Sequence, residues 1–285
     1  MTEWREWSAW RQVGAAAVDE VGSAATVGTA AARAVAELAQ SVADHAPEAF
    51  PEPIIDAVEL LIEHQSVMAP IANLRNVVYL ALPGGPLEVA VAATDLSERL
   101  EASTRLIGKT GAELITDGST VLIHSASSSV RSVLEEAKSR VSFNVCCTEA
   151  MPIGEGIEMA ADLTAIGFEV EVLADEVAIE LLPGMDLVLA GADAIGPGSA
   201  INKTGTAALA RRARAIGVPF YLVAAAEKVL PAPLFERAVL RRGRESLAEV
   251  ISLDWFTAVV SDAGILAPDE AVELAAGRPV AAQLL

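Results

Sequence analysis

The stretch LVLAGADAIGPGSAINKTGTAALA, residues 187–210, contains the signals that decide the fold. It begins with an apolar run of the kind that forms a strand buried on both faces of a parallel sheet. Gly191 and Gly198 allow tight backbone turns after this run, and a helical apolar pattern follows from Thr206. A strand, a glycine-rich loop and a helix in this order predict part of a β–α–β unit.

Working outward from this stretch, the chain repeats the same alternation from residue 119 onward. The expected strands are 120–125, 141–147, 169–174, 186–191 and 218–224. The expected helices between them are 128–139, 156–167, 176–182 and 206–217. Such a series predicts a parallel sheet with right-handed crossovers, so we expect a Rossmann-like α/β domain over residues 113–285.

The preceding part, residues 1–112, has the apolar spacing of helices instead. Residues 27–46 and 53–68 repeat apolar side chains at positions i, i+3, i+4 and i+7. A third long helix is expected over 87–108, after the turn-forming PGGP at 83–86. Trp4, Trp7 and Trp10 recur at every third residue, which predicts one helical face that packs against this domain or a partner chain. The sequence therefore predicts an N-terminal helical domain.

Composition excludes several classes of protein. The net charge of −19 argues against a nucleic-acid binder, which needs a basic surface. The acidic excess lies in residues 1–210, since residues 211–285 carry acids and bases in equal number. No apolar run is long enough to predict a transmembrane helix, and the N-terminus lacks the pattern of a signal peptide. Cys146 and Cys147 are adjacent and favour a reducing compartment, so we expect a cytoplasmic protein without membrane contact.

In parallel sheets the ligand crevice lies beyond the carboxyl ends of the strands. Asp193 follows one such end, and Asn202 and Lys203 are expected at the mouth of the next helix. A carboxylate beside a lysine suits a general base, and the helix N-terminus after Lys203 offers N–H groups to a phosphate. The alternative, that Asp193 caps a turn while Asn202 and Lys203 hold the loop, stays open.

Other features predict less chemistry. No Walker or dinucleotide fingerprint is present, so we expect no cofactor. The histidines lack metal-ligand spacing, so we expect no metal site. Basic residues also gather after the last expected strand, at Arg237, Arg241, Arg242 and Arg244. We expect a solvated helix face there, with contact to an acidic part of a neighbouring subunit as the alternative.

Several ordered motifs together resemble one family. GADAIGPGSAINKTGT (191–206) and VPFYLVAAAEK (218–228) resemble the GAD-x-I, NK-x-GT and P-x-x-V-A…K pattern of the initiation factor 2B alpha/beta/delta superfamily. The segments PIANLRNVVYLA (70–81), VLIHSASSSV (121–130), TEAMP (148–152) and VISLDWFTAVVSDAGILAP (250–268) are similar to further family segments. This superfamily includes subunits of the translation factor and aldose–ketose isomerases acting on methylthioribose 1-phosphate and ribose 1,5-bisphosphate.

The resemblance implies a site. It implies Asp193 as the catalytic base and Ser125 at the position of the isomerases' catalytic cysteine. The implied ligand-binding residues are His124, Thr148, Glu149, Gly191, Asn202, Lys203 and Lys228.

Three departures from the isomerase pattern bear on activity. Ser125 is a much weaker acid than the cysteine that it replaces. Met151 stands where the isomerases have a phosphate-binding arginine, and Val21 stands at the equivalent of a second one. Neither side chain can replace a guanidinium at a phosphate.

These departures favour a non-catalytic or weakly catalytic member of the family. Such a protein would keep a residual crevice for a sugar phosphate or nucleotide-like ligand and act through protein contacts. The alternative is an aldose–ketose isomerase in which Asp193 shuttles the proton. The resemblance also implies a homodimer or higher homo-oligomer, with a small phosphorylated ligand and no direct contact with nucleic acid.

Overall fold

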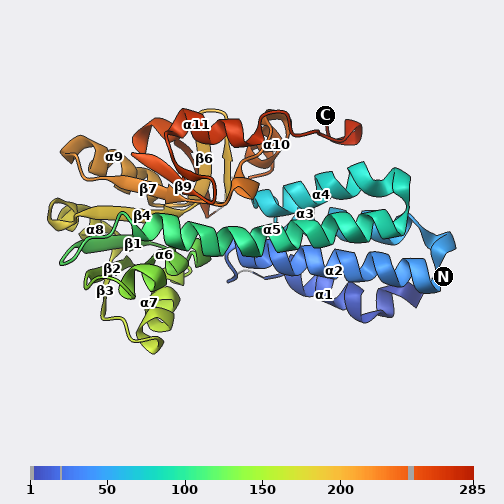
Figure 1. Ribbon diagram of the computed structural model, residues 1–285, viewed down its shortest axis with the longest axis horizontal. Helices are drawn as coiled ribbons and strands as arrows, with labels where there is room; N and C mark the ends of the chain where they lie inside the picture. Colours follow the sequence, from blue (N-terminus) through green and yellow to red (C-terminus); the bar gives the residue numbers. More distant parts are fainter. Residues whose placement is uncertain (1–2, 20, 243–246) are drawn as a thin grey trace. The chain divides into compact units, whose positions relative to one another are not determined.

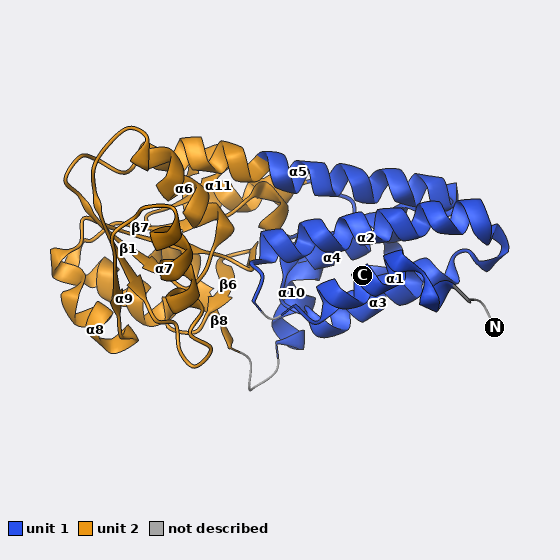
Figure 2. Cartoon of the chain, turned by 90° about the horizontal axis from the view of Figure 1, so that it is seen from below, with its two compact units in different colours: residues 1–102, 230–242, 277–285 blue, residues 103–229, 243–276 orange. Residues whose placement is uncertain are grey.

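The computed structural model describes residues 3–19, 21–242 and 247–285 (Figure 1). The chain divides into two compact units, each assembled from separate segments (Figure 2). Unit 1 comprises residues 1–102, 230–242 and 277–285, and unit 2 comprises residues 103–229 and 243–276. Arg244 of the basic cluster lies outside the described residues.

Unit 1 is helical, as the sequence predicts. Its helices are α1 (Ser8–Ala17), α2 (Ala24–His45), α3 (Glu52–His64), α4 (Ala69–Ala81), the first part of α5 (Pro86–Ala112) and α10 (Ala232–Arg241). Small residues let these helices approach closely. A Cβ atom on Gly28 of α2 would lie 2.3 Å from the Cβ atom of Pro70 in α4, so only glycine fits there.

The three N-terminal tryptophans do not share one helical face. Trp4 lies in a 3₁₀ helix (Glu3–Glu6), Trp7 precedes α1, and Trp10 lies within α1. Trp4 is fully buried, and its ring centroid lies 4.8 Å from that of Trp10. The regular spacing of the tryptophans does not show that one helix ends and another begins between them. The expected packing of this segment within the domain is confirmed for Trp4.

The end of the chain also belongs to unit 1. The Asn76 side chain in α4 donates to the carbonyl of Pro279 at 2.9 Å and accepts from the amide of Ala281 at 2.9 Å. One buried amide side chain thereby satisfies two backbone groups of the segment 277–285, which fixes this segment on α4.

Unit 2 is built on a seven-stranded sheet in the order β10-β9-β7-β4-β1-β2-β3. All neighbouring strands are parallel except β9 and β10. The strands are β1 (Thr120–His124), β2 (Asn144–Thr148), β3 (Val170–Leu173), β4 (Leu187–Gly191), β7 (Phe220–Val223), β9 (Ala258–Ser261) and β10 (Gly264–Leu266). The first five are the strands that the sequence predicts, and together they confirm the α/β fold class.

Helices cover both faces of this sheet (Figure 1). One face packs on α8 (Asp175–Leu181), α9 (Thr206–Ile216) and α11 (Pro268–Val272), the other on α6 (Ser128–Lys138), α7 (Glu155–Ala165) and the end of α5. Successive residues of β1 alternate between the two cores, with Leu122 in the first and Ile123 in the second. Burial on both faces explains why these strands are uninterrupted apolar runs.

A second, three-stranded antiparallel sheet interrupts the predicted loop 191–202. It consists of β5 (Ala194–Gly196), β6 (Ser199–Lys203) and β8 (Ala248–Ser252), in the order β5-β6-β8. The turn between β5 and β6 is made by Pro197 and Gly198, and Gly198 has a φ of 69°. The sequence analysis expected only a glycine-rich loop between the strand and the helix here, and the hairpin was missed because Pro-Gly is also the signal of a tight hairpin turn.

No helix within the described ranges is long and apolar enough to cross a membrane.

Candidate functional site

The candidate site is built at the carboxyl ends of β1, β2, β4 and β7, entirely within unit 2. β1 ends at His124, and the next residue, Ser125, has a left-handed backbone with a φ of 63°. Ala150, just after β2, has a φ of 56°. Non-glycine residues adopt this conformation at a cost and concentrate at functional sites. In the described part of the chain, these two are the non-glycine residues with positive φ, and both lie at this sheet edge.

His124 is a neutral, buried imidazole at the centre of this edge. Its side chain is 2% exposed, and its Nδ1 atom lies 2.7 Å from the hydroxyl of Thr148. Burial lowers the pKa of His124 below its ordinary value, against the opposing charge of Asp175. Its Nε2 atom has no hydrogen-bond partner of ordinary geometry among the described residues, and the backbone of Thr204 interacts with the imidazole and opposes the lowering of its pKa. A Cβ atom on Gly205 would lie 3.2 Å from Nε2, so the backbone of this residue packs beside that nitrogen.

Thr148 is held in place by a very close backbone approach. A Cβ atom on Gly156 would lie 1.7 Å from the carbonyl oxygen of Thr148, so a side chain cannot be accommodated there. Gly156 also donates its amide to the carbonyl of Glu149 at 3.1 Å. This contact fixes the end of β2 against the start of α7 and thereby positions the partner of His124.

Glu155, which the sequence analysis missed, links two of the predicted residues. Its Oε2 atom accepts a hydrogen bond from the Ser125 hydroxyl at 2.6 Å, and its Oε1 atom accepts one from Lys203 Nζ at 3.1 Å. Lys203 is buried and the Glu155 side chain is 18% exposed, so this ion pair is largely shielded from solvent. One feature of the sequence could have pointed to Glu155: it is an acidic residue in the first turn of a helix, directly after Gly154.

Asp193 lies between β4 and β5, where the backbone leaves the main sheet. Its amide donates to the carbonyl of Ile201 at 2.8 Å, which ties it to the β5–β6 hairpin. Burial raises the pKa of the Asp193 carboxyl to about 6, and the charge of Glu155 acts in the same direction. Lys228 and Lys203 oppose this rise. The carboxyl therefore changes protonation near neutral pH.

Lys228 follows β7 and is 3% exposed. Its ammonium donates to the carbonyl of Ala192 at 2.7 Å, directly beside Asp193. Burial lowers the pKa of Lys228, and the charge of Asp193 counteracts this effect. The two residues form a coupled pair at the end of β4.

Asn202 and Lys203 lie at the end of β6 and not in an open loop. The Asn202 amide donates to the hydroxyl of Thr206 at 2.9 Å, and that hydroxyl donates to the carbonyl of Lys203 at 2.6 Å. Both side chains are buried. These bonds fix the strand end that carries Lys203.

The N-terminus of α9 is already partly occupied, so it offers fewer free N–H groups to a phosphate than the sequence predicts. The carboxylate of Glu249 accepts hydrogen bonds from the amides of Gly205 at 2.9 Å and Ala207 at 2.8 Å. Glu249 lies in β8, far away in sequence, so only the tertiary fold brings this anion to the helix dipole.

The remaining predicted residues have less direct roles in the arrangement. Gly191 ends β4, and a Cβ atom there would lie 2.8 Å from the hydroxyl oxygen of Ser127, so its lack of a side chain leaves room for the loop after β1. Glu149 follows β2 and donates its amide to the carbonyl of Leu173, while no hydrogen bond of its carboxylate is found among the described residues. Met151 is 50% exposed, and its amide is held by Asp175.

The described residues include no group of three or more potential ligands that could hold a metal ion. The titratable side chains at this edge are Asp193, Glu155, the two buried lysines Lys203 and Lys228, and His124.

Comparison with known proteins identifies similar sequences. Residues 20–252 match the family described as the initiation factor 2 subunit family. A relative from Pyrococcus abyssi, named putative translation initiation factor eIF-2B subunit 2-like, is 30% identical over 254 residues, which cover 85% of this chain and 91% of the relative. A ribose 1,5-bisphosphate isomerase from Methanocaldococcus jannaschii is 33% identical over 220 residues, covering 74% of this chain and 70% of the enzyme.

The fold also matches a solved structure. The crystal structure of the Pyrococcus horikoshii translation initiation factor eIF-2B superposes with a TM-score of 0.81 at 24% identity, covering 91% of this chain and 97% of that one. Since the family match spans most of the sequence, the chain belongs to the initiation factor 2 subunit family.

Proposed function

We propose that the protein is an aldose–ketose isomerase acting on a sugar 1-phosphate of the ribose 1,5-bisphosphate or methylthioribose 1-phosphate type. The observation that carries this proposal is the Asp193 carboxyl, whose pKa is raised to about 6 beside the ammonium groups of Lys228 and Lys203. A general base works best when its pKa lies near the operating pH. The relative from Methanocaldococcus jannaschii named as an isomerase supports the same reading.

In the proposed reaction, the C1–O4 bond of the sugar ring breaks and O4 takes up a proton. Asp193 carries the proton from C2 to C1, and the C2 hydroxyl loses its proton and becomes the carbonyl. The overall change is an isomerisation, so it needs no oxidant or reductant. Lys203 and Asn202, the last two residues of β6, would hold the sugar oxygens. Ser125 or a water takes the place of the thiol that the related isomerases have, and Glu155 fixes the Ser125 hydroxyl.

Two buried polar atoms support a ligand at this edge. His124 Nε2 and the hydroxyl of Ser129, in the first turn of α6, have no hydrogen-bond partner of ordinary geometry among the described residues. Buried polar groups in folded proteins are generally satisfied, so these atoms fit the oxygens of a bound sugar or phosphate.

A second candidate is a non-catalytic regulatory protein, and one observation favours it. Glu155 already accepts the one proton of the Ser125 hydroxyl and compensates the charge of Lys203, so both offer less to an anionic substrate. Met151 adds no positive charge at the neighbouring loop. A protein of this kind would bind its ligand weakly and act through protein contacts, as the name of the Pyrococcus abyssi relative suggests.

An assay of ketose formation separates the two candidates. Ribose 1,5-bisphosphate, methylthioribose 1-phosphate and other aldose 1-phosphates would be supplied to wild type, Asp193→Asn and Asp269→Asn, the last being an exposed residue. We expect turnover in wild type and Asp269→Asn, a loss of at least 10²-fold in Asp193→Asn, and a fall in rate as the pH drops through about 6. Absence of turnover on every substrate would leave the regulatory candidate.

We also propose that the protein is a cytoplasmic homodimer or larger homo-oligomer. The basis is the family resemblance together with the high apolar content of the chain, which is compatible with a sizeable interface. Multi-angle light scattering of the full chain tests it, and a monomer at micromolar concentration would contradict it.

A further inference from the structure

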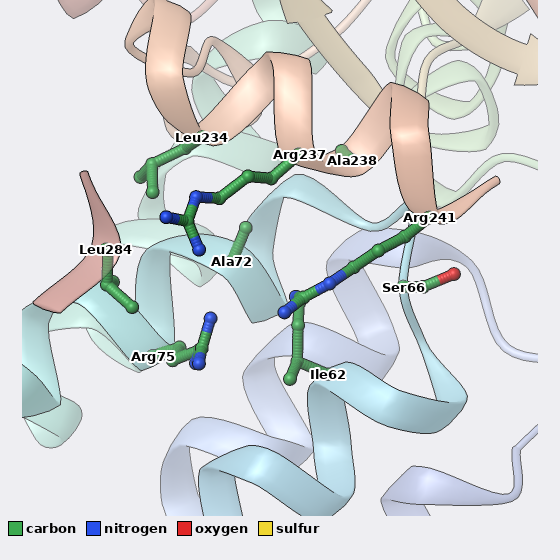
Figure 3. A pocket seen from close by; sticks show the side chains of 9 residues that line it. All are labelled: Ile62, Ser66, Ala72, Arg75, Leu234, Arg237, Ala238, Arg241 and Leu284. Carbon is green, nitrogen blue, oxygen red and sulfur yellow. The ribbon is translucent and has the colours of Figure 1, made fainter.

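A pocket in unit 1 gathers three arginines. It lies between α4 and α10, and its polar lining includes Arg75, Arg237 and Arg241 (Figure 3). The guanidinium groups of all three point toward this space (Figure 3). All of the lining residues belong to unit 1, whereas every residue of the candidate site above belongs to unit 2.

One of the three arginines, Arg75, forms an ion pair with a carboxylate of the same chain, Glu59. Arg75 donates from Nε to Glu59 Oε1 at 2.6 Å and from Nη2 to Glu59 Oε2 at 2.9 Å. The hydroxyl of Tyr79 donates to the same carboxylate at 2.9 Å. The Arg75 side chain is 12% exposed, and its two bonds to Glu59 hold the planar guanidinium in one orientation. Two of its five N–H groups are used by Glu59, and the others are left for a further acceptor.

The other two arginines make no ion pair with a side-chain carboxylate among the described residues. Arg237 donates from Nη2 to an oxygen of Leu285, the last residue of the sequence, at 2.6 Å. Arg241 is exposed, and no hydrogen bond or ion pair of its guanidinium is found within the ranges that the structure describes. Partial burial lowers the pKa of Arg241, and the charges of Arg75 and Arg237 lower it further, while Glu59 opposes them. The side chains of the cluster therefore carry three positive charges against the one negative charge of Glu59.

Such an excess of positive charge stands out in a chain with a net charge of −19. Like charges held close together destabilise a fold, so an anion that joins them is favoured. The rest of the lining is mostly apolar and includes Ile62, Leu234 and Leu284.

We propose that this pocket binds a small oxyanion, namely a phosphate or carboxylate group, through Arg75, Arg237 and Arg241. Planar guanidinium groups match the oxygens of both anions. The anion would join three stretches that are distant in sequence: α4, α10 and the chain around Leu284. Binding should consequently stabilise unit 1.

Thermal unfolding of the full chain tests the proposal. Wild type would be compared in sodium phosphate, sodium citrate and sodium chloride at equal ionic strength. We expect the unfolding midpoint to rise by about 3 °C in phosphate at roughly ten times its dissociation constant. The citrate arm distinguishes a carboxylate ligand from a phosphate ligand. Equal midpoints in all three salts would overturn the proposal.

Variants locate the effect. Arg241→Gln and Arg237→Gln should each remove most of the phosphate-dependent shift, and Arg212→Gln, an exposed arginine of α9, should retain it. Lys203→Gln should also retain it, because that residue belongs to the site in unit 2. A shift that persists in both pocket variants, or that disappears with Lys203→Gln alone, would place the anion elsewhere. A fall in oligomeric mass of Arg241→Gln without any anion effect would instead indicate an acidic side chain of a second copy.

Discussion

The Ser125 hydroxyl donates a hydrogen bond of 2.6 Å to Glu155 Oε2, so the proton of this hydroxyl is already shared with a carboxylate of the chain itself. The other oxygen of Glu155 is bonded to Lys203. One side chain thus controls a hydroxyl, a lysine and, through its charge, the protonation of Asp193. Substitution of Glu155 therefore tests its influence on the protonation of Asp193.

Glu155→Gln should lower the pKa of Asp193. Removing the carboxylate charge takes away one cause of the raised pKa and leaves the charge of Lys203 less compensated. We expect a downward shift of a few tenths of a unit to about one unit. A ¹³C NMR titration of labelled aspartate carboxyls measures it, with Asp193→Asn identifying the signal. Glu158→Gln, exposed on the same helix, should leave the value unchanged, and a rise in the pKa of Asp193 in Glu155→Gln would contradict the assignment.

Asp193→Asn should stabilise the fold in a pH-dependent manner. The folded pKa is raised to about 6 from an ordinary value of 3.8, so the folded protein binds more protons than the unfolded chain between these values. Wild-type stability accordingly falls as the pH rises through this window and is constant above it. We expect the gain from Asp193→Asn to be about 2 kcal/mol larger at pH 7 than at pH 4.

Urea unfolding at the two pH values measures this difference. Asp269→Asn, which is exposed, should show no such dependence. An equal effect of Asp193→Asn at both pH values would mean that the carboxyl is not perturbed by its surroundings.

Gly156→Ala should destabilise the protein strongly. The new Cβ atom would lie 1.7 Å from a backbone oxygen, which cannot move without displacing the end of β2. We expect a loss of about 2 kcal/mol or more in the free energy of unfolding. Gly14→Ala in α1 is the matched control, since nothing lies within 4 Å of its Cβ position, and it should gain about 0.5–1 kcal/mol. Urea unfolding that ranks the two variants equally would refute the close approach.

Glu249→Ala should weaken the start of α9. Two amides of the first turn lose their acceptor, and the helix dipole loses a negative charge. We expect a cost of about 1 kcal/mol in the free energy of unfolding by urea. Glu236→Ala, exposed on α10, controls for removal of a surface charge. If both variants lost the same small amount, Glu249 would not act as a cap.

By itself, the sequence determined the elements that depend on local patterns. The five parallel strands are continuous apolar runs because both of their faces are covered, and the flanking helices follow from an apolar period of 3.6. The family resemblance rested on ordered motifs, and the match over residues 20–252 confirms it. The sheet-edge rule also selected the loops that meet in the candidate site, because parallel strands end at one edge.

Only the tertiary structure decided the pairings between distant residues. The hairpin of β5 and β6 depends on its pairing with β8, some 50 residues later, so the stretch 191–202 is not a loop. Glu249 reaches the amides of α9 through the same pairing. Glu155 accepts hydrogen bonds from Ser125 and Lys203, and three arginines line one pocket. The spacing of these residues in the sequence gives no sign of either arrangement. Local patterns in the sequence determine which helices and strands form. Which charged side chains neutralise one another, and which polar groups meet at a site, depends on how the folded chain brings distant residues together.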